Sequence, residues 1–364
     1  MSHRLACAVG SAALLAACLG GGDGAVSPTV DDQSAVFTHI GFLPNAVSSQ
    51  ATAVSGDGLV VVGSSTSISG KSEAFRWSSS NGMTSLGLME SGSFSSARAA
   101  SADGSVIVGD GDSRNAGSTV FRWSATTGLV QLNALANSSL CVAGGVSGDG
   151  NTVVGTCLIA GNSGFRWTES SGMVSLGQFG GGSNRTSNAL AISSDGGTVV
   201  GIGHPVLTGA LIWSLGSEPN LLGALPGDVS AAADSVSRDG SVVVGYSTNP
   251  SSHQRAFRWT RQTGMMALVS TTAVLGDVIA SAVSGDGRTV VGWGNTLAGE
   301  TALVWDEAHG IRQLVDVLKL DYQTTLTGWT LSRATGISDD GRTMVGFGVN
   351  PDGSTEGWAL TFRK

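Results

Sequence analysis

Short apolar runs, broken by clusters of turn-forming residues, set the pattern of the chain from about residue 38 onward. In the first part of this region the runs are ATAVS, LVVVG, EAFRW and MTSLGLM. Gly, Ser, Asn and Asp separate them, and runs of this length bounded by such residues predict β-strands joined by tight turns. The phrase ATAVSGDGLVVVG at 51–63 returns almost unchanged as ASAVSGDGRTVVG at 280–292. An internal repeat is therefore the first feature to define.

Asp-Gly pairs mark the repeat, and a Trp follows each of them in step. The pairs are spaced by 44 to 47 residues, with a longer interval of 54 before the last one. The seven Asp residues are Asp57, Asp103, Asp149, Asp195, Asp239, Asp286 and Asp340. The seven Trp residues are Trp77, Trp123, Trp167, Trp213, Trp259, Trp305 and Trp358. The chain thus contains seven units of about 46 residues.

Four predicted strands per unit indicate the blade of a β-propeller. The predicted fold is all-β: a seven-bladed β-propeller over residues 38–364, with four antiparallel strands per blade. A β-helix or another solenoid is the competing repeat architecture. The last unit lacks a fourth strand, and Thr38–Leu43 resembles the missing piece. We expect this N-terminal strand, at about 38–43, to complete the last blade and so remove the exposed edges.

Small residues distinguish the first strand of each unit. ATAVS, RAASA, ADSVS and ASAVS consist mainly of Ala and Ser, whereas the later strands carry Phe, Trp and Leu. A wedge-shaped blade has least room at the axis, so these first strands are predicted to be innermost. The Trp-bearing third strand is then predicted to lie further out, between neighbouring blades.

Composition and charge agree with this interpretation. The 364 residues include 55 Gly, and only 13% are charged, a mixture that favours strands and tight turns over helices. The net charge of −8 argues against nucleic acid as a partner, because nucleic-acid binding needs a basic surface.

The first residues have the organisation of a secretory signal. A basic start is followed by the short apolar run LACAVGSAALLAA, which is too short to span a bilayer as a helix. Leu15-Ala16-Ala17-Cys18 resembles the lipobox of bacterial lipoproteins, which implies cleavage after residue 17 and a lipid on Cys18. Residues 18–37 are then a flexible tether. The expected location is the outer membrane, facing the periplasm or the cell surface. An ordinary cleaved signal, with Cys18 incidental, is the alternative.

Cys141 and Cys157 are the cysteines that remain after the signal and Cys18. If Ser147 faces Asn151 across the turn between them, the same register places the two cysteines opposite each other. We therefore expect a cross-strand disulfide. Two buried free thiols are the alternative.

The repeated phrases resemble the HAF-type bacterial extracellular repeats. The resemblance rests on A-x-A-V-S-x-D-G-x-x-V-V-G, on Ala256–Thr260 (AFRWT) and on Gly172–Gly177 (GMVSLG). It covers roughly residues 38–364, although units with Leu211-Ile212-Trp213 or Leu303-Val304-Trp305 lack the Phe and Arg. It implies export and display in the envelope, and it defines no biochemical activity.

The repeated Asp, Arg and Trp residues each allow two interpretations. The Asp residues could bind calcium, but one Asp per loop does not supply the six to eight oxygens that Ca²⁺ needs. A structural turn with Gly at positive φ, closing a three-residue loop, is the favoured interpretation. The Arg residues of the Phe-Arg-Trp runs could bind acidic ligands, but we expect their heads to meet a carboxylate or carbonyl inside the ring. The Trp residues are expected to be inter-blade wedges and not sugar platforms.

No catalytic motif, metal site or phosphate loop is recognisable, and we expect no cofactor. The remaining histidines, His39, His204, His253 and His309, fall in different units. The largest departure from the repeat is an insertion at about 311–332. It includes a predicted short amphipathic helix from Gln313 to Leu320, followed by three candidate site residues. We predict that this insertion caps the central channel, with the candidate residues Asp321, Tyr322 and Trp329.

The sequence therefore predicts an exported, lipid-anchored propeller that binds an envelope protein or a glycan without catalysis. A monomer is expected. The alternative is a propeller enzyme, such as a polysaccharide lyase or hydrolase, with its site at one rim of the ring.

Overall fold

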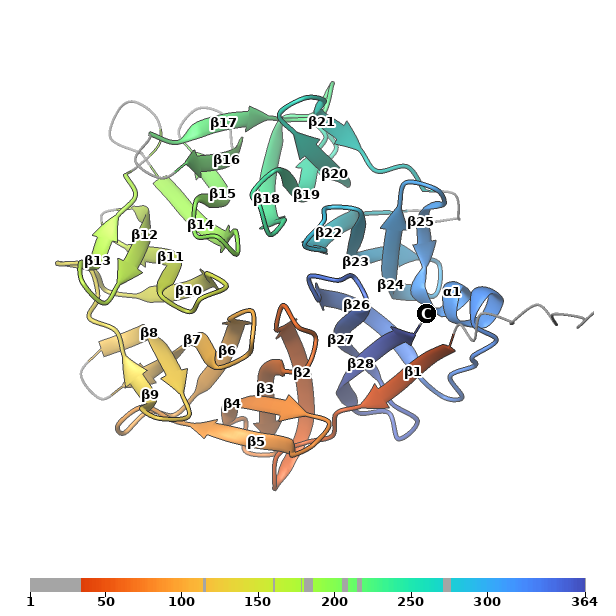
Figure 1. Cartoon of the computed structure of the whole chain (residues 1–364), viewed down its shortest axis with the longest axis horizontal. Coiled ribbons are helices and arrows are strands. Elements are labelled where there is room, and N and C mark those ends of the chain that lie inside the picture. Colours follow the sequence, from red (N-terminus) through yellow and green to blue (C-terminus); the bar gives the residue numbers. More distant parts are fainter. Residues whose placement is uncertain are drawn as a thin grey trace, which may run out of the picture.

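Seven four-stranded antiparallel sheets surround a central axis in the computed structural model (Figure 1). The structure describes residues 34–363 except 114–115, 160, 178, 180–185, 205–208, 215–217 and 271–275. Each sheet is one blade of a seven-bladed β-propeller, so the predicted fold class and the four strands per blade are confirmed. The predicted signal, tether residues 18–33 and Cys18 lie outside the described residues.

Six blades each use four consecutive strands of the chain. The first three are blade 1 with β2 (Ala46–Val54), β3 (Val61–Ser67), β4 (Ser72–Ser78) and β5 (Gly82–Gly87), blade 2 with β6 (Ser95–Ala100), β7 (Val106–Ser113), β8 (Ala116–Ser124) and β9 (Gly128–Gln131), and blade 3 with β10 (Cys141–Val146), β11 (Thr152–Leu158), β12 (Asn162–Thr168) and β13 (Gly172–Ser175).

The next three blades follow the same order. They are blade 4 with β14 (Thr186–Ile192), β15 (Thr198–His204), β16 (Gly209–Ser214) and β17 (Asn220–Gly223), blade 5 with β18 (Ser230–Val236), β19 (Val242–Thr248), β20 (Gln254–Thr260) and β21 (Gly264–Ala267), and blade 6 with β22 (Val278–Val283), β23 (Thr289–Thr296), β24 (Gly299–Asp306) and β25 (Gly310–Gln313).

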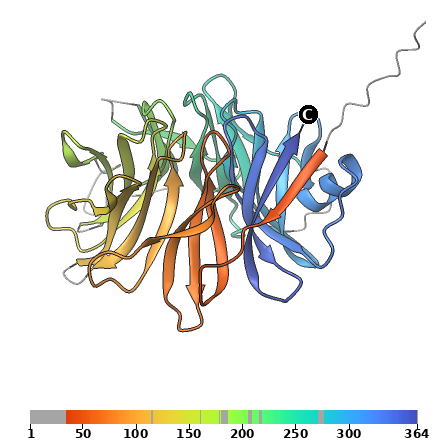
Figure 2. The same ribbon diagram turned by 60° about the horizontal axis from the view of Figure 1, so that its bottom comes forward.

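Blade 7 combines both ends of the described chain. It contains β26 (Thr330–Ile337), β27 (Thr343–Val349) and β28 (Thr355–Arg363), and β1 (Ser34–His39) pairs antiparallel with β28 as the fourth strand. The red strand β1 lies along the outer edge of this blade in Figures 1 and 2. Closure by an N-terminal strand is confirmed.

The bounds of the closing strand differ from the prediction. The strand covers residues 34–39 and not 38–43, so residues 34–37, expected in the tether, belong to the sheet. Ile40 and Leu43 are instead buried in the core between blades 7 and 1. The run THIGFL at 38–43 matches TSLGLM at 84–89, and their glycines, Gly41 and Gly87, both adopt positive φ at or just after the end of a strand. The similarity therefore located the end of the strand and the turn after it.

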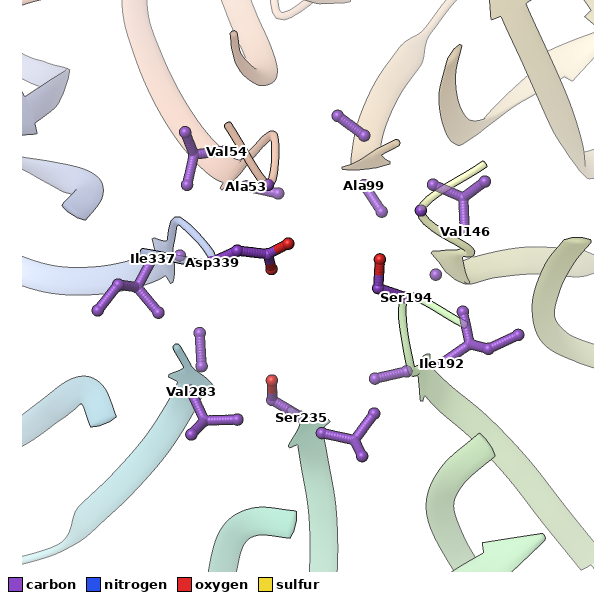
Figure 3. A pocket seen from close by; sticks show the side chains of 18 of the residues that line it. Ala53, Val54, Ala99, Val146, Ile192, Ser194, Ser235, Val283, Ile337 and Asp339 are labelled. Atoms are coloured by element: carbon purple, nitrogen blue, oxygen red, sulfur yellow. The ribbon is translucent and has the colours of Figure 1, made fainter. Parts of the chain in front are cut away.

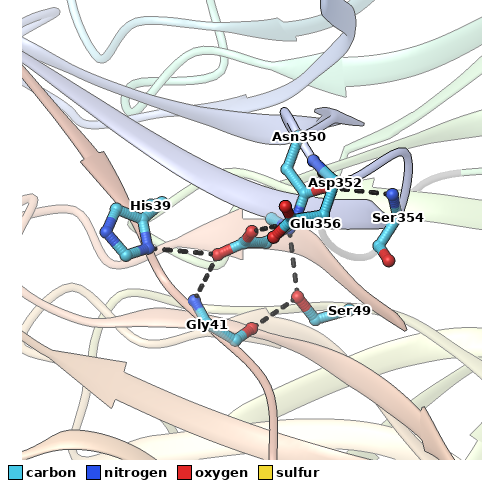
Figure 4. Close-up of polar contacts among 8 residues, drawn as sticks. His39, Gly41, Ser49, Asn350, Asp352, Ser354 and Glu356 are labelled. Carbon is cyan, nitrogen blue, oxygen red and sulfur yellow. Dashed lines mark hydrogen bonds and ion pairs between the residues drawn. The ribbon is translucent and has the colours of Figure 1, made fainter. Parts of the chain in front are cut away.

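A polar cluster fixes the segment that follows β1 (Figure 4). The buried carboxylate of Glu356 accepts hydrogen bonds from the amide of Gly41 (3.0 Å) and from Asn350 Nδ2 (2.8 Å), and His39 Nδ1 lies 3.2 Å away. Ser49 Oγ donates to the Gly41 carbonyl and accepts from the amide of Gly357. Blade 1, blade 7 and the N-terminal segment thus share one network.

The first strand of each blade is innermost, and its central residues are small, as predicted. One residue in each of these strands is bulged out of register, directly after an Ala that faces a Gly of the second strand. The seven Ala–Gly pairs are Ala51–Gly63, Ala97–Gly109, Ala143–Gly155, Ala189–Gly201, Ala233–Gly245, Ala280–Gly292 and Ala334–Gly346.

The Asp-Gly loops share one geometry in all seven blades. In blade 3, Ser147 Oγ donates to Asp149 Oδ1 (2.6 Å) and accepts from the amide of Thr152, while Asp149 Oδ1 also accepts from the amide of Asn151. Gly150 has φ +73°, the conformation that favours glycine. Each Asp therefore shapes a turn.

The register across this turn differs from the prediction by one residue. Ser147 pairs with Thr152 and not with Asn151, so the loop has four residues and not three. The bulge at Gly144 then restores the expected register, and Cys141 faces Cys157. The predicted disulfide is confirmed, with Cα atoms 4.1 Å apart. The extra residue in the loop and the bulge at Gly144 each shift the register by one residue, in opposite directions, so the two shifts cancel.

The insertion forms helix α1 (Leu314–Asp321) at the outer rim, beside β25 and β1 (Figures 1 and 2). Leu314, Val317 and Leu318 are buried in a core cluster with Trp358 and Phe362 of blade 7. The helix is amphipathic as predicted, but it does not cap the central channel. Its apolar face packs into a core cluster that it shares with residues of blades 6 and 7.

Candidate functional site

A cavity of about 220 Å³ lies on the axis, lined by the inner strands and by the Asp-Gly loops. Its apolar lining residues include Val54, Val146, Ile192, Val283 and Ile337. Figure 3 shows the side chains of Ser194, Ser235 and Asp339 pointing into this space. The cavity therefore combines apolar residues with several polar groups that could orient a ligand.

Backbone hydrogen bonds between neighbouring Asp-Gly loops form a collar around one end of the cavity. We call the face of the ring that carries these loops the turn face. At six of the seven blade junctions, a loop amide donates to a carbonyl of the next loop, over 2.8 to 3.3 Å. The bonds run from Asp57 to Ala102, Ala102 to Gly148, Gly148 to Ser194, Arg238 to Gly285, Gly285 to Asp339 and Asp339 to Gly56.

The close approach of these loops restricts the residue between Ser and Asp. A Cβ on Gly148 would lie 2.0 Å from Ser194 Oγ, and one on Gly56 would lie 2.8 Å from Asp339 Oδ2. Five of the seven loops have Gly, Ala or Ser here. The exceptions are Arg238 and Asp339, which form an ion pair of 2.9 Å between blades 5 and 7. This ion pair lies at the turn-face end of the cavity.

At two equivalent positions in each blade, the seven copies of the repeat carry different residues, four of which line the cavity. Each blade contributes the bulged residue of its inner strand and the residue after the paired Gly of its second strand. We call these fourteen residues the axial ring. They are Thr52 and Ser64, Arg98 and Asp110, Gly144 and Thr156, Leu190 and Ile202, Asp234 and Tyr246, Ser281 and Trp293, and Thr335 and Phe347.

Two threonines of the axial ring have a structural role. Thr52 Oγ1 donates to the carbonyls of Val62 and of Ala97 in the next blade, and Thr335 Oγ1 donates to the carbonyl of Ala51. These bonds tie neighbouring inner strands together. Other members of the axial ring carry charge or aromatic surface.

Blade 2 places an ion pair in the axial ring. Arg98 Nε and Nη2 donate to Asp110 Oδ1 and Oδ2, at 2.8 and 3.3 Å. Asp110 is buried, whereas the side chain of Arg98 is half exposed and lines the cavity. The hydrogen bond to Asp110 raises the pKa of Arg98. The pair holds a permanent guanidinium at the axis.

Blade 5 places an unpaired carboxyl in the axial ring. Asp234 accepts no hydrogen bond from any described residue, and burial raises its pKa to about 7. The pKa of the neighbouring Tyr246 is also raised, first by burial and then by the Asp234 charge. Near neutral pH, Asp234 therefore exists in both protonation states.

Aromatic side chains occupy the same axial-ring position in three consecutive blades. They are the half-buried Tyr246, Trp293 and Phe347 of blades 5, 6 and 7. The guanidinium of Arg333 stacks 3.9 Å above the Trp293 ring and forms an ion pair with Glu300. The hydrogen bond from Arg333 lowers the pKa of Glu300. The axial ring is thus aromatic over blades 5 to 7 and polar over blades 1 and 2.

The candidate residues of the insertion do not lie at the axis. Asp321 pairs with Arg312 at 2.7 Å, Tyr322 packs on Phe362, and Trp329 packs edge-on against Phe37. All three hold α1 and β1 at the outer rim, where burial raises the pKa of Tyr322.

Other sequence candidates are also kept apart. The seven Asp residues of the Asp-Gly pairs lie in seven separate loops, and no described group of three or more His, Cys, Asp or Glu residues is placed to hold a metal ion. The charged and aromatic members of the axial ring were missed. These residues could have been found by comparing the copies of the repeat, because they stand where the copies differ, as in ADSVS in place of ASAVS.

The Trp residues of the third strands pack between blades, as predicted, and two of the four Arg residues meet a backbone carbonyl, as expected of all four. Arg122 Nε donates to the carbonyl of Gly150 in the next blade (3.2 Å), and Arg258 Nε donates in the same way to Gly287 (3.1 Å). Trp358 and Trp213 are fully buried, and the other five Trp residues of the repeat pack against core clusters.

Solved propellers are similar to this chain in fold. The β-propeller domain of the trilobed protease from Pyrococcus furiosus aligns with a TM-score of 0.59 at 13% identity, over 86% of this chain and 95% of that one. Oligogalacturonate lyase from Vibrio parahaemolyticus aligns with a TM-score of 0.57 at 10% identity, over 90% and 97%. TolB from Acinetobacter baumannii aligns with a TM-score of 0.50 at 12% identity, over 71% of this chain and 64% of TolB.

These likenesses establish the fold alone, because all the identities are low. No family model and no curated protein matches the sequence. Among the described residues, no helix has the length and apolarity needed to cross a membrane.

Proposed function

We propose that this protein is an exported, lipid-anchored β-propeller of the bacterial envelope that binds a protein or glycan ligand without catalysis. The ligand binds at the axial ring, and Cys18 carries the lipid. The proposal includes membership of the HAF-type extracellular repeat proteins.

The observation that carries the proposal is the position of the non-repeating residues. The Ala, Gly, Ser and Asp positions that build the ring are nearly the same in every blade. Arg98, Asp234, Tyr246, Trp293 and Phe347 occupy equivalent positions at which the copies of the repeat differ, and Arg98 lines the axial cavity directly. Propeller architecture does not require charge or aromatic surface at these positions, so we assign them to ligand recognition.

Two further observations support an exported location. The Cys141–Cys157 disulfide suits an oxidising compartment such as the periplasm. The N-terminal sequence has a lipobox-like stretch ending at Cys18. Labelling with a radioactive fatty acid tests the anchor: wild type is expected to incorporate the label, and Cys18→Ser is not. Equal labelling of both would contradict the anchor.

The binding role is tested by photo-crosslinking in intact cells. A photoreactive amino acid replaces Ser235, which points into the cavity, or Met266, which is exposed on the outer strand β21. We expect a discrete crosslinked product from position 235 and none from position 266. Products of equal yield at both positions, or no product at position 235, would contradict ligand binding at the axial cavity.

The two tyrosines of the chain provide a matched pair of variants. Tyr246→Phe removes one hydroxyl from the axial ring, and Tyr322→Phe removes one from the outer rim. The first is expected to lower the yield of the crosslink at position 235 at least threefold, and the second to leave it unchanged. Equal loss in both variants would indicate a general effect on the fold.

A further inference from the structure

Three grooves follow one another on the turn face, across the junctions of blades 1–2, 2–3 and 3–4. Their volumes are about 690, 380 and 370 Å³. Arg122 lines the first and second groove, and Arg166 lines the second and third. The two shared arginines make the grooves one continuous track over four blades.

The arginines of the track occupy equivalent positions in blades 1, 2 and 3. Arg76, Arg122 and Arg166 each pair with a Val that precedes the conserved Gly of the second strand. The equivalent residues of blades 4, 6 and 7 are Ile212, Val304 and Ala359, so Arg258 of blade 5 has no Arg at the equivalent position of either neighbouring blade. Arg at this position in three consecutive blades is therefore confined to blades 1 to 3.

The third groove contains two buried donors without an acceptor. Arg166 Nε and the indole N–H of Trp213 are both buried, both residues line this groove, and neither atom meets an acceptor among the described residues. Arg166 Nη2 is already engaged with Thr152 Oγ1 at 3.2 Å. Buried donors without an acceptor are rare in folded proteins, so their convergence on one groove points to an acceptor-bearing ligand.

The charges along the track favour an anionic ligand. Three arginines outnumber the two acidic residues of the track, Asp103 and Glu169, in a chain whose net charge is −8. Asp103 is engaged in its turn by Ser101 and by Ser105, and these hydrogen bonds lower its pKa. Guanidinium groups bind carboxylate and sulfate oxygens in forked geometry.

The remaining lining favours a sugar over an acidic peptide. The half-buried indoles of Trp123 and Trp167 line the first and second groove, where the C–H face of a sugar ring can stack on them. The other lining residues are rich in hydroxyls that can exchange hydrogen bonds with sugar hydroxyls. They are Ser105, Ser124, Thr126, Thr127, Thr168, Ser170, Ser171, Ser175 and Ser214.

We propose that this track is a second binding site, which holds an acidic polysaccharide with one ring-borne carboxylate or sulfate at each arginine. The site is separate from the axial ring. Because three subsites engage one chain, a polymer binds more tightly than its monosaccharide by effective concentration.

The test measures binding of the full chain in mild detergent to polyglucuronate, dextran sulfate, neutral dextran, poly-L-glutamate and free glucuronate. We expect polyglucuronate to bind at least tenfold more tightly than neutral dextran, poly-L-glutamate and free glucuronate, with affinity falling as salt rises. Equal affinity for dextran sulfate supports recognition of either oxyanion on a sugar. Equal affinity for poly-L-glutamate or for neutral dextran would overturn the proposal, as would no binding at all.

Arg258 supplies a matched control. Arg122→Gln and Arg258→Gln each remove one equivalent hydrogen bond to a turn carbonyl, so their effects on stability should be alike. Arg122→Gln and Arg166→Gln are expected to weaken polyglucuronate binding at least tenfold, and Arg258→Gln less than twofold. Equal loss in Arg258→Gln would assign the arginines to packing alone. Tyr246→Phe tests independence from the axial ring and should leave polyglucuronate binding unchanged.

Discussion

At Gly201, one backbone carbonyl oxygen restricts a position of the repeat to glycine. A Cβ at this position would lie 1.9 Å from the carbonyl oxygen of Asn188, because the bulge at Leu190 turns that carbonyl toward the second strand. The same contact recurs at Gly63, Gly109, Gly155, Gly245, Gly292 and Gly346, at 1.9 to 2.2 Å. The Gly at the end of V-V-G is therefore required by the bulge in the facing strand, which the sequence pattern does not otherwise indicate.

Gly201→Ala is expected to destabilise the protein by about 3 kcal/mol or more, because backbone in the sheet must move. Gly128→Ala serves as the control, since no atom lies within 4 Å of its Cβ position. There only the positive φ of 64° opposes the change, at about 1–2 kcal/mol. Chemical denaturation of both variants measures the difference. A smaller loss in Gly201→Ala than in Gly128→Ala would contradict the role of the bulge.

Asp234 makes stability depend on pH in a direction opposite to that of an ordinary paired carboxylate. Burial raises its pKa to about 7, so the folded state holds a proton that the unfolded state releases at lower pH. Its contribution to stability is therefore greatest below pH 4 and is lost as pH rises through 7. Asp234→Asn is expected to gain about 1–2 kcal/mol over wild type at pH 8, less than the whole shift implies because the side chain is half-buried.

The measurement is the free energy of unfolding of both proteins from pH 4 to pH 8. Asp234→Asn should lose less stability over this interval than wild type does. The nearest titratable group is Tyr246, which pairs with Ala232 on the adjacent strand and stays neutral throughout this range. If the free energies of unfolding of the two proteins change in parallel with pH, Asp234 does not contribute to the pH dependence of stability.

Asp57 and Asp234 show which residue environments can be predicted from the sequence and which cannot. Asp57 lies beside two glycines in a phrase that recurs seven times, and turn chemistry predicts its environment from neighbours alone. Asp234 lies in ADSVS, where the pattern indicates only an inner strand. Its burial depends on the bulge and on the blades around it, which are long-range contacts. The predictable residue is structural, and the unpredictable one lies at the candidate site.

At the scale of elements, the Asp-Gly loop is held by a buried Ser. Ser237 Oγ donates to Asp239 and accepts from the amide of Val242, whereas the exposed Ser241 Oγ bonds to Asp239 alone. Ser237→Ala leaves a buried amide unpaired and is expected to cost about 2 kcal/mol. Ser241→Ala removes a solvent-exposed bond and should cost less than about 0.5 kcal/mol. Thermal unfolding of the two variants compares them directly, and equal losses would refute the capping role of Ser237.

The disulfide and the helix show how far elements can be predicted. The Cys141–Cys157 pairing follows from the sequence only because the four-residue loop and the bulge at Gly144 offset each other. Helix α1 was identified by its apolar stripe, but the stripe does not indicate which surface covers it. Its partner surface comes from Leu331, Trp358 and Phe362 of blade 7. Local pattern specifies an element, and tertiary contacts specify its position.

At the scale of the whole molecule, one strand from the start of the fold completes a sheet formed by its end. The unit count and the missing fourth strand predicted this closure from sequence. The structure adds the buried Glu356, whose carboxylate meets the amide of Gly41 and lies beside His39. Without β1, the edge of β28 is open and this carboxylate loses two of its partners. Loss of β1 should therefore affect blade 7 first and then the seam with blade 1.

Removal of residues 1–43 is expected to lower the Tm by at least 10 °C and to promote association through the open edge of β28. A circular permutant that carries residues 34–43 after Arg363, through a flexible linker, restores the same antiparallel pairing from the other end of the chain. It should recover most of the lost Tm and remain monomeric by light scattering. If the permutant is as unstable as the truncated chain, then connectivity and not strand pairing closes the ring. If truncation has no effect, the six-bladed remainder and a three-stranded seventh blade are stable without closure, and the axial cavity does not depend on β1.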